Sequence, residues 1–138
     1  MAGYSGTPLP AKLGIKEGAT VALLDAPPGL ISGLPSGVAV KRQARGRADV
    51  VVAFFTDRAR LERRIGALSK MIFPAGGLWI AWPKRTSGVA TDISDNAIRE
   101  VALTLGLVDN KVCAVDDTWS GVLVVWRRAL RHAGAPAL

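Results

Sequence analysis

The sequence predicts a single α/β domain of three layers, with a sheet between helices. Short apolar runs of strand length occur at residues 19–24, 49–55 and 78–82. Amphipathic segments with helical spacing follow the second and third of these runs. The chain has 138 residues, which suits one domain, and it contains no internal repeat. We therefore expect a mainly parallel sheet that is covered on both faces.

The two ends of the chain have the composition of loosely attached segments. Residues 1–18 are rich in glycine and proline, so we expect an N-terminal arm with one short helical turn near residues 9–13. The folded domain is predicted to span residues 19–128. The tail at residues 129–138 contains glycine and proline, and we expect it to be flexible.

The first half of the chain contains three predicted strands. Residues 19–24 are mostly apolar, which predicts a strand buried on both faces. A short helical turn at residues 29–33 leads to a strand at 37–42, whose charged end suits the edge of the sheet. Residues 49–55 form the most continuous apolar run and are rich in β-branched and aromatic side chains. We therefore place this third strand at the centre of the sheet.

A long helix is predicted directly after the third strand. Thr56 or Asp57 is its candidate N-cap, and Pro74 stops it. The next strand is predicted at residues 78–82 and ends at Pro83. The apolar stripe of the helix recurs at helical spacing and comprises Leu61, Ile65, Leu68 and Ile72.

A second long helix and a hairpin complete the predicted domain. Asp92 and Asp95 resemble a capping pair at the start of the helix, and Gly106 ends it. The last two strands are predicted at residues 111–116 and 121–127. Because only a few residues separate them, they are expected to pair as an antiparallel hairpin.

Composition and charge narrow the functional classes. Lys and Arg total 18 against 11 Asp and Glu, and the formal charge of +7 favours a polyanionic partner. Cys113 is the only cysteine and His132 the only histidine, so we expect neither a disulfide nor a metal site, and Cys113 is predicted to be an inert core thiol. No apolar run reaches the roughly 20 residues of a membrane span. We expect a cytoplasmic protein with no membrane contact.

One motif gives the second half of the chain a family resemblance. Phe73-Pro74-Ala75-Gly76-Gly77 lies between the first long helix and the fourth strand, and a helix and the hairpin follow. This succession resembles a class I S-adenosylmethionine-dependent methyltransferase, pared down in length. The resemblance implies a Rossmann-like domain whose six strands, numbered along the chain, lie in the order 2-1-3-4-6-5 with the sixth antiparallel.

A second resemblance covers nearly the whole chain. Residues 3–18 (GYSGTPLPAKLGIKEG), 82–88 (WPKRTSG) and 105–121 (LGLVDNKVCAVDDTWSG) resemble a family of small bacterial proteins catalogued only as a domain of unknown function. This resemblance brings no activity with it, because no catalytic residues are assigned to that family.

The implied sheet order brings three strand ends together. Ligands of open α/β sheets bind outside the carboxyl ends of the strands, at the point where the strand order reverses. Residues 25–29, 56–57 and 82–87 would then surround one crevice. Lys84 and Arg85, with the neighbouring hydroxyl groups, suit a phosphate or carboxylate there, although an ordinary solvated loop is an alternative. The candidate ligand-binding residues are Asp25, Gly29, Asp57, Lys84, Arg85, Thr86 and Ser87.

The loop after the first strand lacks the pattern of a nucleotide-type cofactor site. It contains two prolines, which have no amide hydrogen, where such sites have glycines. The second strand ends in Lys41 and Arg42, where such sites have an acid. We therefore expect no cofactor and interpret the chain as a non-methylating domain that binds a small anionic ligand or a protein partner. No catalytic residue is assigned.

Two alternatives remain open. One is an S-adenosylmethionine-dependent methyltransferase with an atypical cofactor loop. The other is a nucleic-acid-binding module that uses the basic segments 41–47 and 58–64. These segments contain no aromatic side chain on which a base would stack. The oligomeric state is left open.

Overall fold

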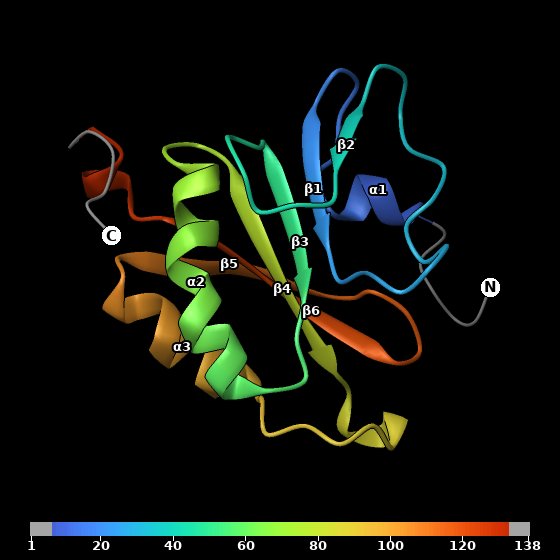
Figure 1. The fold of residues 1–138 in the computed structure, drawn as a ribbon, viewed down its shortest axis with the longest axis vertical. Helices are drawn as coiled ribbons and strands as arrows, with labels where there is room; N and C mark the ends of the chain where they lie inside the picture. Colours follow the sequence, from blue (N-terminus) through green and yellow to red (C-terminus); the bar gives the residue numbers. More distant parts are fainter. Residues whose placement is uncertain (1–6, 133–138) are drawn as a thin grey trace.

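A computed structural model describes residues 7–132, and they form a six-stranded sheet in the order β2-β1-β3-β4-β6-β5 (Figure 1). The strands β1 to β4 are parallel to one another, and β6 is antiparallel to both β4 and β5. The predicted fold class, strand order and antiparallel sixth strand are therefore confirmed. The strands are β1 (Thr20–Leu24), β2 (Ala39–Lys41), β3 (Val50–Phe54), β4 (Gly77–Pro83), β5 (Leu107–Ala114) and β6 (Trp119–Trp126).

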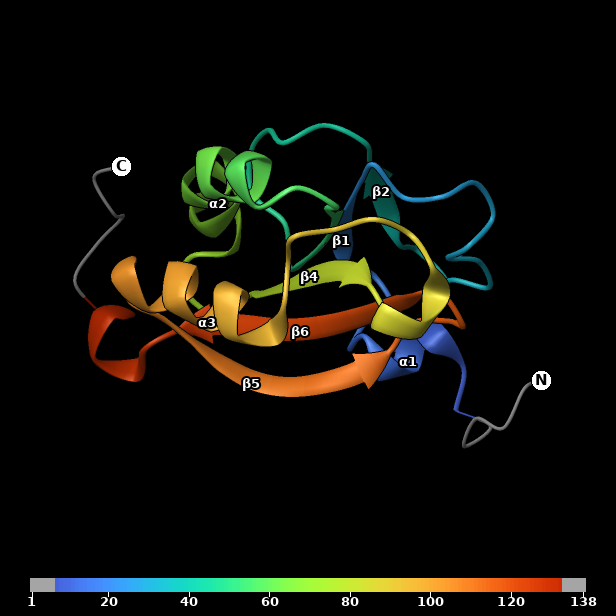
Figure 2. The ribbon, with the colours of Figure 1, turned by 90° about the horizontal axis from the view of Figure 1, so that it is seen from below.

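Both long helices lie on the same face of the sheet, as Figure 2 shows. They are α2 (Arg58–Ile72) and α3 (Asp95–Thr104). The opposite face is covered by the four-residue helix α1 (Leu9–Lys12) and by apolar side chains of the loop between β1 and β2. The third layer of the domain is therefore thin, and loop residues replace the helix that would otherwise follow β1.

The centre of the sheet is apolar on both faces. All five residues of β3 are buried, as expected for a strand that has neighbours on both sides and layers above and below. Two buried indoles connect the sheet to the outer layers. Trp79 Nε1 donates to the Leu13 carbonyl at 2.9 Å, and Trp126 Nε1 donates to the Ser69 carbonyl at 2.9 Å.

Three local predictions differ from the structure. The segment 29–33 contains no helix: the Leu30 N–H donates to the Pro27 carbonyl at 3.2 Å, and Gly29 has φ +73°. This is the geometry of a turn that requires positive φ at its third residue. The helix α3 begins at Asp95, and its N-cap is Ser94, not Asp92. The last two strands begin at residues 107 and 119, because the long antiparallel ladder between them extends β5 and β6 toward their N-termini.

The ends of the chain are only partly described. Residues 1–6 of the predicted arm and 133–138 of the predicted tail lie outside the described residues. The helical turn predicted near residues 9–13 is present as α1, and a short 3₁₀ helix occupies Arg128–Leu130. No helix of the described residues is long and apolar enough to cross a membrane.

Candidate functional site

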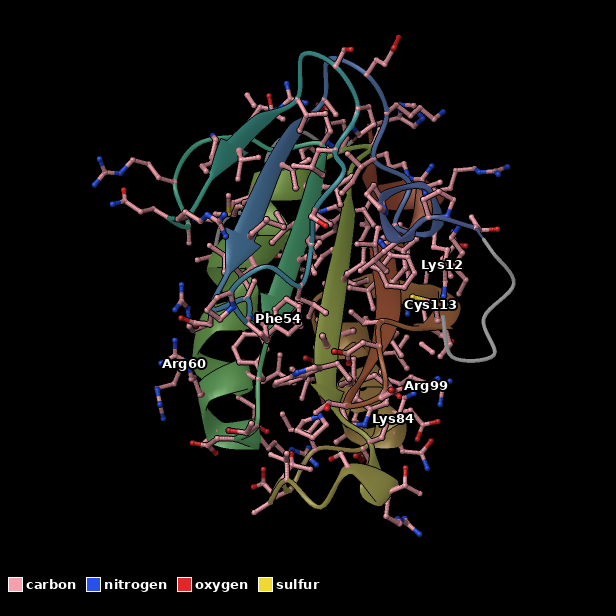
Figure 3. The ribbon with its side chains drawn as sticks, turned by 90° about the vertical axis from the view of Figure 1, so that its right-hand side faces the viewer. Lys12, Phe54, Arg60, Lys84, Arg99 and Cys113 are labelled. Carbon is pink, nitrogen blue, oxygen red and sulfur yellow. The ribbon has the colours of Figure 1, made fainter. Side chains whose placement is uncertain are left out.

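Asp25 directly follows β1 and has an unusual backbone conformation. Its φ is +59°, in the left-handed region that non-glycine residues rarely adopt and that Asp tolerates better than most. Its carboxylate accepts a hydrogen bond from Arg60 Nη2 at 2.6 Å, and Arg64 Nη1 lies 3.9 Å away. Figure 3 shows Arg60 on the side of α2 that faces the β1 end of the sheet. Asp25, a predicted site residue, thus forms an ion pair with α2 that the sequence analysis did not predict.

Asp57 is the N-cap of α2, which confirms one of the two residues predicted for that position. Its Oδ1 accepts from the Ala59 N–H at 3.0 Å, and Asp92 Oδ1 accepts from the Arg58 N–H at 2.7 Å. The neighbouring Thr91 Oγ1 donates to the Thr56 carbonyl at 2.7 Å. Two carboxylates of the chain itself therefore satisfy the first amides of this helix, so it offers little to an external anion.

The loop after β1 is open beside its glycines. Gly29 and Gly33 have φ of +73° and +67°, and a Cβ built on either would meet no heavy atom within 4 Å. The glycines are thus required by backbone conformation and leave their main chain accessible to a ligand. The loop approaches the sheet through apolar side chains that include Ala26, Leu30 and Ile31.

An aromatic pair lies at the carboxyl end of β3. Phe54 and Trp119 pack edge to face, with ring centroids 5.1 Å apart. Asp116 Oδ1 accepts from the backbone N–H groups of Thr118 and Trp119, at 2.8 and 2.7 Å, which holds the tryptophan at the end of the sheet. The sequence predicts a hairpin turn here. It contains no signal that would place Trp119 beside Phe54, because the two residues are 65 positions apart in the chain.

The segment after β4 is a short 3₁₀ helix, Arg85–Ser87. Ser87 Oγ donates to the Lys84 carbonyl at 2.7 Å, so its hydroxyl is committed to the turn. A hollow of about 470 Å³ lies between this segment and the start of α3. Arg85 lines the hollow together with Trp82 and Asp95, whereas Asp25, Gly29, Asp57, Lys84, Thr86 and Ser87 do not. The predicted site residues therefore surround one edge of the sheet without sharing a single pocket.

The end of β2 carries a cation with a structural function. Lys41 Nζ donates to the carbonyls of Arg45 and Arg47, at 3.0 and 2.8 Å. Its charge therefore closes the loop between β2 and β3 and is not directed at a ligand beside β1. Within residues 7–132, no three His, Cys, Asp or Glu side chains lie close enough together to hold a metal ion.

No family model and no curated protein matches the chain. Solved structures do. The chain is similar to an S-adenosylmethionine (SAM)-dependent methyltransferase from Aquifex aeolicus, with TM-score 0.59, 15% identity and coverage of 83% of this chain and 85% of that chain. It is also similar to a magnesium protoporphyrin IX methyltransferase from Synechocystis PCC 6803 with bound SAM, with TM-score 0.55, 11% identity and coverage of 86% and 74%.

These comparisons correct two predictions. The interpretation as a non-methylating domain that binds a small anion or a protein is contradicted, because the two solved structures reported above are methyltransferases. The prediction of no cofactor is contradicted by the SAM bound in one of them. Both predictions relied too heavily on the sequence of the loop after β1. In an open α/β sheet, the position of a ligand depends first on where the carboxyl ends of the strands meet. The likeness establishes that the chain has the α/β fold of SAM-dependent methyltransferases.

Proposed function

We propose that this domain binds SAM at the carboxyl ends of β1 and β3 and transfers its methyl group to an acceptor. The observation that carries the proposal is the sheet order. The strand β2 lies on one side of β1, and the next strand along the chain, β3, lies on its other side. The strand order therefore reverses between β1 and β3. Open sheets bind ligands at this point.

The residues at this edge suit SAM in two respects. The sulfonium and the α-ammonium of SAM are both positive, and Asp25 places a half-exposed carboxylate at the end of β1. Gly29 and Gly33 leave their main chain open, which suits close approach of a ligand to the backbone. When bound, SAM supplies an electrophilic methyl group. Asp25 would orient the cationic part of SAM in exchange for its contact with Arg60.

One requirement of the usual site is not met. The ribose hydroxyls of such cofactors are held by an acid after the second strand, and here Lys41 takes that place and bonds to its own loop. The proposed function is therefore that of a SAM-dependent methyltransferase with an atypical cofactor loop, which is the first of the two alternatives in the sequence analysis. Trp119, half-buried at the start of β6, packs against Phe54 at the end of β3 and offers an aromatic surface against which the adenine can pack.

The acceptor is assigned to the hollow after β4. Its volume of about 470 Å³ is within the range of small-molecule sites, and it lies at the end of the strand that neighbours β3. Arg85 provides a positive charge and Trp82 an aromatic wall, whereas the carboxylate of Asp95 at the same hollow pairs with Arg99 at 3.1 Å. Lys84, Thr86 and Ser87 would support this loop and not contact the acceptor.

Calorimetry with SAM and with S-adenosylhomocysteine tests the proposal. We expect the wild-type protein to bind both, and Asp25→Asn to weaken SAM binding at least about tenfold, because a charge-assisted hydrogen bond contributes about 1.5–3 kcal/mol. Asn also tolerates the left-handed conformation, so the fold is retained. Glu17→Gln, an exposed carboxylate before β1, is the matched control and should leave affinity unchanged. Failure of the wild-type protein to bind either compound would overturn the proposal.

A further inference from the structure

The loop between β2 and β3 presents three arginines without carboxylate partners. Arg42, Arg45 and Arg47 are exposed, and among residues 7–132 none of them forms a salt bridge. The other basic segment is different. In α2, Arg58 pairs with Glu62, and Arg60 pairs with Asp25. Arg64 lies 3.9 Å from the same Asp25 carboxylate, and among the described residues Arg63 is the one arginine of this segment that forms no salt bridge. Most of the unpaired arginine charge of the two segments is therefore in the loop.

The loop is held in shape by Lys41. Its ammonium donates to the carbonyls of Arg45 and Arg47, and the Arg45 N–H donates to the Gln43 carbonyl at 2.9 Å. Because the lysine binds the main chain at these two residues, their side chains are left to point outward. The arginines therefore belong to a preorganised loop, which lowers the conformational entropy lost when the loop binds a partner.

Gly46 is required for this shape. Its φ is +72°, and a Cβ built on it would lie 3.2 Å from Lys41 Nζ. On the inner side, Ala44 packs against the core cluster beneath α2, and the Ala48 N–H donates to the Met71 carbonyl at 2.9 Å. The loop is therefore attached to the domain at both ends, and its outer surface carries the cations. Figure 3 shows the loop on the same side of the molecule as Arg60.

We infer that this loop, residues 41–47, binds the phosphate backbone of a nucleic acid. Guanidinium groups form paired hydrogen bonds with phosphate oxygens, and all three free cations are arginines. A hollow of about 390 Å³ is lined by Lys41, Arg42, Gln43, Arg45 and Gly46 and remains open to solvent. The formal charge of +7 adds long-range attraction. This inference does not depend on cofactor binding at β1.

A nucleic acid suits the surface better than a membrane does. Between residues 41 and 49 the loop has no large apolar side chain that would insert into a bilayer. The loop also has no aromatic side chain, so we expect backbone contacts and little sequence preference.

Fluorescence anisotropy with a labelled single-stranded RNA of about 16 nucleotides tests the inference. The variant Arg42→Gln with Arg45→Gln and Arg47→Gln removes three cations. We expect it to lose at least tenfold in affinity at low salt. The plot of log affinity against log salt should become shallower by about two, since each phosphate contact on a single strand contributes about 0.7 to the slope.

The matched control removes three exposed cations elsewhere, with Lys111→Gln, Arg127→Gln and Arg128→Gln. An equal loss in this control would show that net charge alone attracts the RNA and would overturn the inference. Binding to phosphatidylserine vesicles without binding to RNA would also overturn it, in favour of a membrane. SAM titrations of both triple variants should match the wild type, so failure of the cofactor proposal remains distinguishable.

Gly46→Val separates loop shape from charge. It keeps every cation but opposes the positive φ and crowds Lys41. If circular dichroism shows a folded protein, we expect affinity for RNA to fall at least threefold. Wild-type affinity in this folded variant would contradict a preorganised loop.

Discussion

Arg60 of α2 donates a 2.6 Å hydrogen bond to the carboxylate of Asp25 at the end of β1. This contact joins the first long helix to the strand end at which we propose that SAM binds. Both side chains are about half exposed, at 41% and 54%. Exposed pairs contribute little to stability, so the contact affects the local charge of the site more than the fold.

Arg60→Ala should therefore change the free energy of unfolding by less than about 1 kcal/mol. It should also strengthen SAM binding, because Asp25 is released for the cationic ligand. Urea unfolding and calorimetry measure the two effects. Weaker SAM binding in this variant would show that Arg60 itself contacts the cofactor.

Asp57 is expected to act as a helix cap. Asp57→Ala should lower the free energy of unfolding by about 1 kcal/mol, because the Ala59 N–H loses its acceptor. Asp57→Ser keeps a capping oxygen and should retain most of the stability. Urea unfolding of both variants is the measurement, and equal losses would contradict the capping function.

Trp79 attaches the N-terminal segment to the sheet. Trp79→Phe removes the buried hydrogen bond to the Leu13 carbonyl and leaves that carbonyl without a donor from the indole. We expect a loss of about 1–3 kcal/mol from the unpaired group, with a further loss from the smaller ring. Trp119→Phe is the control, because this ring is only half-buried. Chemical denaturation that gave the same loss for both variants would contradict this assignment.

Gly106 needs both its conformation and its small size. Its φ is +92°, and a Cβ there would collide with Leu130 Cδ1. Gly14 has φ +77° but has no atom within 4 Å of such a Cβ. Gly106→Ala should therefore destabilise the protein by at least about 1 kcal/mol more than Gly14→Ala, as measured by thermal unfolding. Equal effects would mean that Leu130 moves aside at no cost.

Cys113 is expected to react slowly. Burial raises the pKa of its thiol, and the nearby Lys12 and Lys111 lower it only in part. At about pH 8 the folded protein should react with Ellman's reagent more slowly than the unfolded chain. Lys111→Gln should slow the reaction further. Because the folded state favours the protonated thiol, its contribution to stability is present below the ordinary pKa and is lost as the pH rises through the raised value.

Local patterns predicted the order of the elements well. The apolar run at 49–55 and the stripe through α2 each reflect burial of neighbouring residues, which sequence spacing reports directly. The capping of α3 was predicted wrongly for a physical reason. Asp92 is a residue type that often caps helices, but its carboxylate accepts a hydrogen bond from the Arg58 N–H of another helix. Only a tertiary contact distinguishes these two uses.

The sheet edge that carries the candidate site was predicted from the strand order. The meeting of the ends of β1, β3 and β4 follows from strand order, and Asp25 and Arg85 lie at that edge. The pairing of Asp25 with Arg60 links residues 35 apart and has no local signal. Lys41 likewise has no local signal for its contacts. The sequence suggests an ordinary surface cation, whereas in the structure its ammonium closes the loop between β2 and β3.

By itself, the sequence determined the six strands, the two long helices and the mainly parallel sheet, because backbone propensity and burial periodicity are local properties. The tertiary structure alone decided which charged groups remain free. The ion pair of Arg60 with Asp25 joins residues far apart in the chain, so Arg60 of α2 is paired, whereas Arg42, Arg45 and Arg47 of the β2–β3 loop form no salt bridge within residues 7–132. Charge composition is additive along a sequence, whereas the charge that a partner meets depends on these contacts.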